Sequence, residues 1–410
     1  MNALEGATEI VKRLKKAGFK AYFAGGWVRD HLLLHPSSDI DIATDAPPKR
    51  ILDLFSQTIL VGLSFGVVVV ILDGMHFEVA TFRKDLGYTD GRKPEQIELS
   101  TPQEDAQRRD FTINGMFYDP IEHAIYDYVG GAEDIKKKII RTIGNPDERF
   151  VEDRLRMIRA IRFACRFDFA IDPETQEAII QNAYSLFPAV AMERIWQELS
   201  KMSQLRHFDR ALIELHRLQL LPVIFPLLEK VHLHDIKQWV SSFKYFPRNC
   251  PTALYLIVLF PKASLTTLLK IFQTLRVSNK DIGLVRLAHR CRQLILQNEA
   301  PALEWVHFYA NPEADHVFRA HAATFPHYER MLLIESHEQR LERLNKHISR
   351  VIQQAPIVTG EMLKQQGIPQ GKLLGTLLKE AEKLAIEQDI EVPEAILNKL
   401  KASHLWPTTT

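Results

Sequence analysis

The chain of 410 residues has only three cysteines, Cys165, Cys250 and Cys291, and they are far apart. An odd number of cysteines without a CxxC pair predicts neither a disulfide framework nor a zinc ribbon. Long hydrophobic runs are also missing, since the longest, residues 67–72, is far shorter than the ~20 residues that span a bilayer. The first residues contain no apolar segment of signal-peptide length, so we expect a soluble cytoplasmic protein without a membrane partner.

An excess of charge of either sign is missing as well. The 52 basic and 51 acidic residues give a formal net charge of +1, so any nucleic-acid binding must come from local clusters of charge. With 46% hydrophobic and 25% charged residues, the composition is that of a globular protein. It excludes extended disorder, collagen-like chains and coiled-coil rods, and the length predicts about three domains at ~150 residues each.

The sequence changes character near residue 135. Before it, short runs rich in Val, Ile, Phe and Tyr alternate with Gly and Asp-Gly turn signals, which predicts strands in a mixed α/β domain. The expected strands lie in residues 20–26, 39–44, 65–74, 76–82, 114–120 and 124–131, with helices over 4–16 and 48–55. After it, apolar residues recur at helical spacing to about residue 400, for example over 152–167 and 194–202. Prolines divide this part into small helical bundles.

A pair of carboxylates, Asp39 and Asp41, precedes an apolar strand signal. Alternate side chains of a strand share a face, so the two would project together and repel unless a divalent cation screens them. Mg²⁺ favours one or two protein carboxylates plus phosphate oxygens. Glu78, in another strand pattern, would complete a three-carboxylate site if its strand lies beside that of the aspartates, and would otherwise face solvent. Two exposed aspartates on an edge strand are the alternative for the DxD motif alone.

A Gly25-Gly26 pair stands upstream, between a strand signal and a helical run. Glycines let the backbone approach a phosphate chain, and a helix N-terminus supplies free N–H groups. Arg29, in the first turn of this helix, could clamp a phosphate bidentately. The order GG-x-x-R-D, followed nine residues later by D-x-D, favours a phosphate site over an ordinary strand–turn–helix corner.

Three runs together carry a family resemblance: GGWVRDHLLLHPSSDIDIAT, FEVATFRKDLGYTDGRKPE and DAQRRDFTINGM. They closely resemble the tRNA nucleotidyltransferases, more specifically the bacterial and eukaryotic (class II) CCA-adding enzymes and the related bacterial poly(A) polymerases of the DNA polymerase beta nucleotidyltransferase superfamily. The resemblance is strong over about the first 200 residues and weak beyond them. Two departures stand out: Leu34-His35, where the family usually has a glycine, and Gly115, where it commonly has an alanine.

The resemblance implies an α+β fold in which a small mixed-sheet nucleotidyltransferase head is followed by an all-helical neck, body and tail. We expect the catalytic head at residues 1–135, the base-recognising neck at 136–204, an RNA-binding body at 205–345 and a tRNA-binding tail at 346–410. It assigns Mg²⁺ to Asp39 and Asp41, with Glu78 as a third catalytic carboxylate. It places Gly25, Gly26 and Arg29 on the phosphates, and Arg109, Asp110 and Asn114 beside the sugar and triphosphate. Residues 82–94 resemble the family's flexible loop, and 191–199 its ERxxxE helix, which supports the nucleotide pocket.

A polar stripe is predicted on a helix that starts near Asn145 or Asp147, because Asp153, Arg156, Arg159 and Arg162 recur every three residues. A solvated face is the usual meaning of such a stripe. Cytosine and adenine, however, both present an amino donor beside an acceptor ring nitrogen, whereas uracil and guanine present the reverse pattern. One Asp/Arg pair could therefore accept CTP and ATP and reject UTP and GTP. The family's EDxxR motif serves this role, so the resemblance assigns base reading to Asp153 and Arg156, and nucleotide contacts to Arg159 and Arg162.

These observations predict a template-independent, Mg²⁺-dependent enzyme that completes or repairs the 3′-CCA end of tRNA from CTP and ATP and releases pyrophosphate. We expect it to hold tRNA by the 3′ end and the acceptor and T arms. A poly(A) polymerase, usually more basic, and an enzyme that adds only A are the alternatives within the enzyme class. A non-enzymatic RNA-binding relative is the alternative outside it. A basic helical face formed by Arg286, His289, Arg290 and Arg292 is expected either to touch tRNA phosphates or to be solvated.

Overall fold

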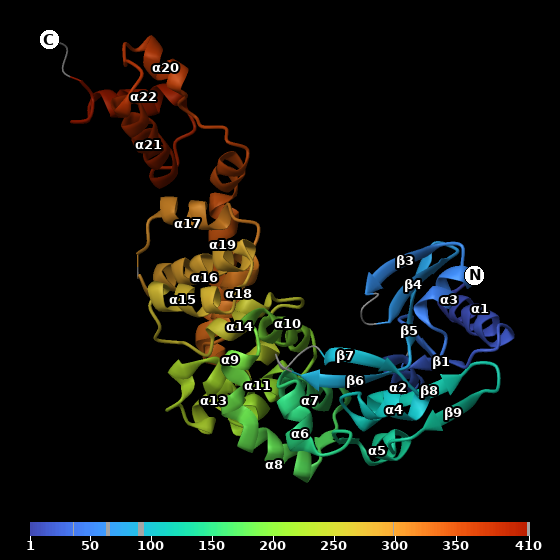
Figure 1. Ribbon diagram of the computed structural model, residues 1–410. Coiled ribbons are helices and arrows are strands. Elements are labelled where there is room, and N and C mark those ends of the chain that lie inside the picture. The colour runs from blue at the N-terminus through green and yellow to red at the C-terminus, as the bar shows by residue number, and fades with distance from the viewer. Residues whose placement is uncertain (36, 63–65, 89–93, 298, 408–410) are drawn as a thin grey trace. The chain divides into compact units, whose positions relative to one another are not determined.

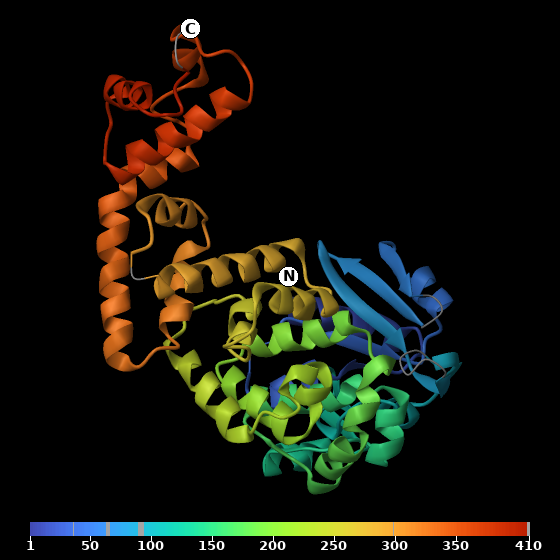
Figure 2. The same ribbon diagram turned by 90° about the vertical axis from the view of Figure 1, so that its left-hand side faces the viewer.

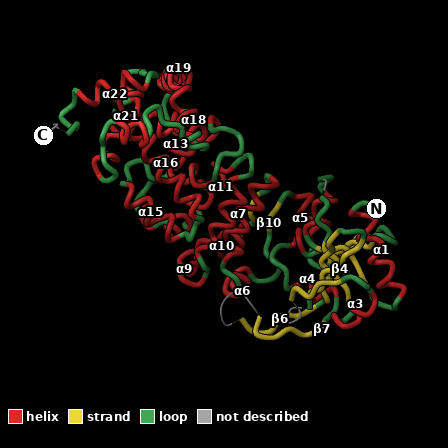
Figure 3. The backbone as a smooth tube through the Cα atoms, turned by 90° about the horizontal axis from the view of Figure 1, so that it is seen from above, coloured by secondary structure: helices red, strands yellow, loops and turns green. Residues whose placement is uncertain are grey.

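The computed structural model describes residues 1–35, 37–62, 66–88, 94–297 and 299–407. They form two compact units, residues 1–237 and 238–410, and each is described by itself (Figure 1). The strands all lie in the first unit, and the described part of the second unit is helical (Figure 3). The α+β class is therefore confirmed, while the finer division into head, neck, body and tail stays a prediction.

A seven-stranded mixed sheet forms the start of the first unit, in the order β3-β4-β5-β2-β1-β8-β9. The strand bounds are β1 Ala21–Ala24, β2 Asp41–Thr44, β3 Thr58–Gly62, β4 Val67–Leu72, β5 Met75–Thr81, β8 Met116–Asp119 and β9 Ala124–Asp127. The β2–β5 pair is parallel, and the other pairs are antiparallel. The predicted strands are thus confirmed, with β3 added at the edge.

Helix α1 (Ala3–Lys16) covers this sheet because its apolar residues recur on one side. Asn2 and Glu5 form a capping box that starts the helix, and Ile10, Val11 and Leu14 are buried. The helix packs on β1, β2 and β5, beside α3 (Pro48–Leu54) (Figure 1). Both helices were predicted at these positions.

A separate antiparallel ribbon joins β6 (Arg83–Tyr88) to β7 (Pro94–Leu99). The polar composition of residues 82–94 predicted a loop, which is wrong for residues 83–88, because cross-strand backbone hydrogen bonds do not need apolar side chains. Residues 89–93 lie outside the described part of the chain. The ribbon leads into α4 (Pro102–Gln107), which starts with a second capping box, and then into the short helix η2 (Thr112–Asn114).

Helices complete the first unit, with two short strands, β10 (Ile139–Ile140) and β11 (Ala170–Ile171), between them. The helices are α2 Gly26–Leu32, α5 Gly131–Lys137, α6 Pro146–Glu152, α7 Leu155–Phe167, α8 Pro173–Asn182, α9 Leu186–Ala189, α10 Met192–Ser203, α11 Phe208–Arg217 and α12 Leu220–Ile224, with α13 Leu233–Val240 at the boundary between the units. α7 packs on both α10 and α11. The single helix predicted to run from Asn145 or Asp147 through the arginine stripe is wrong, because extended backbone angles at Asp153 (φ −147°, ψ 101°) separate α6 from α7.

The second unit is built around two apolar clusters. Its helices are coloured yellow to red in Figure 2. α14 (Thr252–Ile257), α16 (Asn279–Leu296), α17 (Ala302–Tyr309), α18 (Ala314–Ala322) and the long α19 (His327–Ile352) enclose the first cluster, and α15 (Leu265–Thr274) packs on α16. α20 (Gly360–Gln365), α21 (Lys372–Glu387) and α22 (Pro393–Lys401) enclose the second. No described helix is both long and apolar enough to cross a bilayer.

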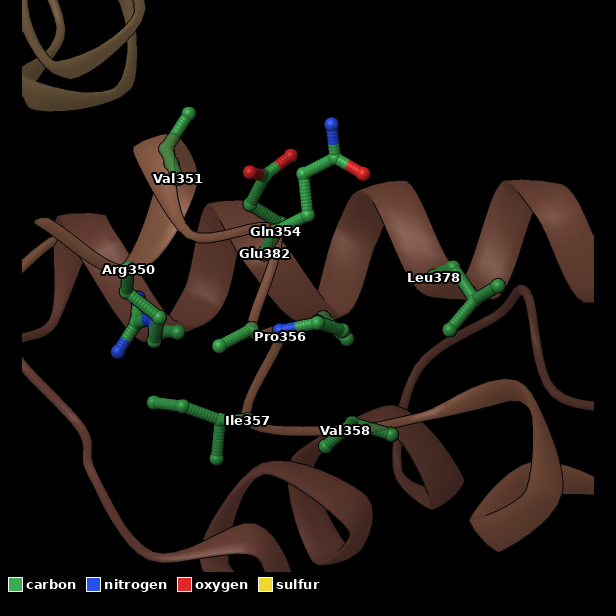
Figure 4. A pocket seen from close by; sticks show the side chains of 11 residues that line it. Arg350, Val351, Gln354, Pro356, Ile357, Val358, Leu378 and Glu382 are labelled. Atoms are coloured by element: carbon green, nitrogen blue, oxygen red, sulfur yellow. The ribbon is translucent and has the colours of Figure 1, made fainter. Parts of the chain in front are cut away.

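The connection after α19 runs along α21 and encloses a small hollow of about 280 Å³ (Figure 4). Pro356, Ile357 and Val358 line it from the connecting segment, and Leu378 lines it from α21. Val358 is also buried in the second apolar cluster, so the connecting segment is packed into that cluster.

Candidate active site

An open pocket of about 460 Å³ in the first unit gathers the predicted nucleotide-binding residues. They come from the β1–α2 corner, from the segment between α4 and β8, and from the α6–α7 region. The pocket is lined by Gly25, Gly26, Arg29, Asp41, Arg108, Arg109, Asp110, Asn114, Asp153, Arg156, Arg159, Arg162, Phe163 and Arg166. Seven arginines face three aspartates in this lining, which favours an anionic ligand.

Gly25 is required at the corner between β1 and α2. Its φ of +66° lies in the left-handed region, and a Cβ there would come within 2.8 Å of the Arg109 Nη1 atom. The glycine therefore permits a chain reversal that side chains rarely adopt and lets the Arg109 guanidinium lie against the backbone. α2 begins at Gly26, earlier than the helical run over residues 28–34 that the sequence predicts.

Arg29 lies buried in the pocket wall, where it is already bonded. Its Nε donates to Asp30 Oδ1 at 2.8 Å and its Nη1 donates to Asn114 Oδ1 at 2.5 Å. The guanidinium also lies 4.6 Å from the centre of the Phe167 ring. Arg29 thus ties α2 to η2, and a phosphate clamp would have to use the guanidinium edge that these bonds leave available.

The carboxylates meet because β2 and β5 are parallel neighbours, with Ile42 opposite Val79. The prediction that Glu78 lies near the aspartates required its strand to be next to β2, and this adjacency is confirmed. Asp39 lies before the strand, which begins at Asp41, so the expectation that both aspartates belong to one strand is wrong. Partial burial is the main cause that raises the pKa of Asp41 to about 6, and repulsion from Asp39 and Glu78 also contributes to the rise. Arg109 acts in the opposite direction and lowers it.

The mutual repulsion of these carboxylates is the observation that fits a divalent cation, because a cation would remove it. Within the described residues, no three His, Cys, Asp or Glu side chains are arranged as a ready ligand set. A Mg²⁺ ion needs only one or two protein carboxylates, so Asp39 and Asp41 suit it without a third.

Asp105 fixes the two arginines of the RRD motif, and sequence reasoning missed it. Arg108 Nε donates to Asp105 Oδ1 at 2.8 Å, and Arg109 Nη2 donates to Oδ2 at 3.0 Å. Burial acts to raise the pKa of Asp105, but Arg109 and Arg108 outweigh it and lower the pKa. The spacing of three and four residues between Asp105 in the last turn of α4 and the two arginines that follow the helix was the signal that could have revealed this pairing.

Asp110 joins the η2 segment to α7. Its Oδ2 accepts from Arg159 Nη2 at 2.6 Å, and its Oδ1 accepts from Asn114 Nδ2 at 3.0 Å. Burial acts to raise the pKa of Asp110, but Arg159 and these hydrogen bonds lower it to about 2. The carboxylate therefore stays ionised and holds Asn114 and Arg159 in one place.

Asp153 and Arg156 flank the break between α6 and α7. Asp153 Oδ1 accepts from the Leu155 backbone N–H at 3.1 Å, and its Oδ2 accepts from Arg194 Nη2 at 2.9 Å. Arg156 Nη1 donates to Glu152 Oε2 at 2.7 Å. Nearly two turns further along α7, Arg162 Nε donates to Glu198 Oε2 at 2.6 Å.

The ERxxxE helix, α10, therefore contacts the pocket residues through both of its motif ends. Arg194 binds Asp153 and Glu198 binds Arg162, so the helix supports the pocket wall. Arg108, Phe163 and Arg166 also line the pocket and were not predicted. Arg166 continues the arginine stripe four residues after Arg162, which was its available signal.

Family models match the chain in two places. A model described as the poly(A) polymerase head domain matches residues 21–141. A second, described as the probable RNA and SrmB-binding site of polymerase A, matches residues 168–231. Residues 21–141 thus have the sequence pattern of a poly(A) polymerase head domain, and arginine-rich helices follow them.

Comparison with individual proteins makes this similarity more specific. The CCA-adding enzyme of Bacillus pumilus is 43% identical over 242 residues, which are 59% of this chain and 58% of that protein. The CCA-adding enzyme of Geobacillus stearothermophilus is 45% identical over 197 residues, 48% of each chain. These alignments span about half the length of the curated relatives. The crystal structure of the Bacillus stearothermophilus CCA-adding enzyme in complex with CTP superposes with a TM-score of 0.79 over 98% of both chains, at 28% identity. The chain is thus similar in sequence to CCA-adding enzymes over about half of its length, and it shares the fold of one such enzyme over almost all of it.

Proposed function

We propose that the protein is a template-independent tRNA nucleotidyltransferase that completes or repairs the 3′-terminal CCA from CTP and ATP and releases pyrophosphate. The observation that carries the proposal is one pocket in which a head carboxylate, Asp41, faces the neck residues Asp153 and Arg156. A catalytic carboxylate and a base-reading pair in one pocket suit transfer of a selected nucleotide without a template.

The proposal places Mg²⁺ at Asp39 and Asp41, with Glu78 as a third carboxylate nearby. When bound, such ions would lower the pKa of the RNA 3′-hydroxyl and neutralise charge on the triphosphate. The chain itself supplies positioning. Arg109, held by Asp105, presents its guanidinium to the phosphates beside Gly25, and the bonded group of Asp110, Asn114 and Arg159 borders the sugar.

Base selection falls to Asp153 and Arg156. With Arg194 and the Leu155 N–H fixing its orientation, the Asp153 carboxylate keeps lone pairs that can accept from the amino group of cytosine or adenine. Arg156, oriented by Glu152, has further N–H groups that can donate to the ring nitrogen. A uracil or guanine would leave both groups mismatched in a confined pocket, which explains their rejection.

The proposal also includes the partner and the compartment. The structure of the Bacillus stearothermophilus enzyme contains CTP, and a tRNA complex is known for the Thermotoga maritima CCA-adding enzyme, whose fold this chain shares. We therefore propose tRNA as the substrate, bound through its 3′ end and its acceptor and T arms, in the cytoplasm.

The test is incorporation of each labelled nucleoside triphosphate into tRNA transcripts that end before CCA, after C and after CC. Ordered addition of C, C and A, followed by a stop, is the expected result. Long A tails on varied RNAs would make the protein a poly(A) polymerase, and addition only to the CC end would make it an A-adding enzyme. RNA binding without incorporation at any Mg²⁺ concentration would make it a non-enzymatic relative.

A further inference from the structure

A larger hollow lies within residues 238–410 and shares no lining residue with the arginine-rich pocket. It has a volume of about 560 Å³, which is within the range of small-molecule sites. Its lining comes from α14, α16, α18 and the segments that flank them. We call it the α16–α18 pocket, and its apolar wall includes Trp239, Phe260, Leu268 and Phe325.

Arg292 of α16 is the only charged side chain in this lining, which contains no carboxylate. Among the residues that the structure describes, Arg292 has no ion pair or hydrogen bond. Its neighbour Arg290, by contrast, donates to Glu304 at 2.8 Å, and Arg286 on the same helix is exposed outside the pocket. The basic face predicted on this helix is thus divided, and Arg292 brings an unbalanced positive charge to an apolar hollow.

Two histidines, also in the lining, add hydrogen-bond donors. His289 precedes Arg292 by one turn of α16, and His321 ends α18, which packs on α16. The His289 Nδ1 and His321 Nε2 atoms are buried without a hydrogen-bond partner. Burial, and then the charge of Arg292, lowers the pKa of both rings, to about 4 for His321, so both are neutral at pH 7.

The protons of these neutral rings can be assigned. An orphaned buried N–H is rarer in proteins than an orphaned acceptor, so we place each proton on the other nitrogen, His289 Nε2 and His321 Nδ1. Neither of these atoms has a bonding partner among the described residues. The lining of the α16–α18 pocket therefore contains a guanidinium, two imidazole rings that each have an unpaired N–H, and aromatic side chains.

We propose that the α16–α18 pocket binds a small aromatic phosphate monoester. Its phosphate oxygens accept from Arg292, His289 and His321, and its ring lies against Trp239 and Phe325. A phosphate offers three terminal oxygens to these three donor groups, and an arginine–phosphate pair is charge-assisted. The ring matches the apolar lining, which a bare inorganic anion would leave empty. This binding site is separate from the proposed nucleotide pocket.

The experiment titrates 1-naphthyl phosphate into the full chain and follows its fluorescence, with thermal melts to check folding. We expect saturable binding. 1-Naphthol and inorganic phosphate should each bind at least ~10-fold more weakly, because the first lacks the phosphate and the second lacks the aromatic ring. Arg292→Met should weaken binding at least ~10-fold, and the matched exposed variant Arg286→Met should leave it unchanged. His321→Leu should also weaken binding.

Equal affinities of the wild type and Arg292→Met would overturn the proposal, because the probe would then lie elsewhere on the chain. Absence of saturable binding to the folded wild type would overturn it too. Loss of RNA affinity in Arg292→Met, without any change in 1-naphthyl phosphate binding, would assign Arg292 to RNA instead. CTP binding should be the same in Arg292→Met and the wild type, because Arg292 does not line the arginine-rich pocket, so the outcome is independent of the proposed enzymatic function.

Discussion

At the scale of single residues, the candidate active site places charges where they oppose one another. Asp41 is repelled by Asp39 and Glu78, and its raised pKa of about 6 reflects an ionised form that is disfavoured without a counter-ion. Asp110 is the opposite case, because Arg159 satisfies its charge and its pKa is about 2. Asp41 is therefore suited to binding a cation, and Asp110 is suited to holding Asn114 and Arg159 in place.

Asp41→Asn should therefore remove activity without lowering stability. We expect incorporation of both C and A to fall at least ~10³-fold, since metal coordination supplies several kcal/mol of the lowered barrier. The melting temperature should stay equal or rise, because the substitution removes repulsion from Asp39 and Glu78. Incorporation assays and thermal melts check this, with Asp53→Asn on the exposed face of α3 as the control. Retained turnover in Asp41→Asn would contradict the metal assignment.

Leu34 is a residue-scale departure from the family pattern with a visible consequence. Its φ is +57°, in the left-handed region, and 90% of its surface is exposed. The family's usual glycine at Leu34-His35 is thus explained by backbone geometry. Gly115, where alanine is common, is explained by packing, because a Cβ there would lie 2.7 Å from Val129 Cγ2.

Leu34→Gly should raise the free energy of unfolding by ~0.5–1 kcal/mol, because it relieves the left-handed strain and gives up almost no packing. Urea unfolding measures the change. Leu332→Gly, at a half-exposed position inside α19, should instead lower the free energy of unfolding by ~1 kcal/mol. A loss of stability in Leu34→Gly would show that the leucine side chain is needed at that turn.

At the scale of elements, the pocket depends on a helix that lines none of it. α10 supplies Arg194 to Asp153 and Glu198 to Arg162, and these bonds hold the α6–α7 break and the last arginine of the predicted stripe. Because α7 packs on α10, we expect a change in this contact to move the proposed base-reading groups and to leave the carboxylates of the sheet in place.

Arg194→Met should therefore reduce base discrimination more than catalysis. Loss of a charge-assisted bond worth ~1.5–3 kcal/mol leaves Asp153 free to reorient, and we expect the preference for CTP over UTP to fall about 10-fold or more. Competitive incorporation assays measure that ratio. The exposed pair of Arg210 with Asp168 offers a matched control, Arg210→Met, which should leave the ratio unchanged. Unaltered discrimination in Arg194→Met would exclude orientation of Asp153 as its role.

At the scale of the whole molecule, the two compact units divide the proposed tasks. Every residue that lines the nucleotide pocket lies within residues 1–237, whereas the second unit has its own apolar clusters and its own pocket. Nucleotide binding should therefore need only the first unit, and RNA binding should need the whole chain.

A fragment of residues 1–237 should bind CTP with a Kd within about threefold of that of the full chain, because the complete pocket lining is retained. The fragment should lose most of its affinity for tRNA, which extends over a much larger surface. Calorimetric titration with CTP and filter binding with tRNA measure the two affinities. A folded fragment that does not bind CTP would mean that the second unit contributes to the nucleotide pocket.

The sequence alone determined many of the elements and most of the residues that line the pocket. Alternating and helical periodicities located β1, β2, β4, β5, β8, β9, α1 and α3, because burial on one side imposes period 2 or 3.6 on a chain. Ordered motifs supplied the ten nucleotide-binding candidates, and the structure brings all ten into one pocket. These features depend on residues that are close together in the sequence, so they can be predicted from the sequence.

Tertiary structure decided what depends on contacts between distant segments. The neighbourhood of Asp41 and Glu78 follows from a parallel pairing of β2 with β5 that no local pattern encodes. The break at Asp153 interrupts a periodicity that continues across it, and Arg194 holds that residue from 41 positions away. Three other features also depend on the tertiary structure. They are the bonds of Asp105 to Arg108 and Arg109, the polar ribbon of β6 and β7, and the charge of Arg292, unpaired within the described residues, in an apolar hollow. A side chain's partners are set by the whole fold, and only the fold shows which charges are satisfied and which remain available.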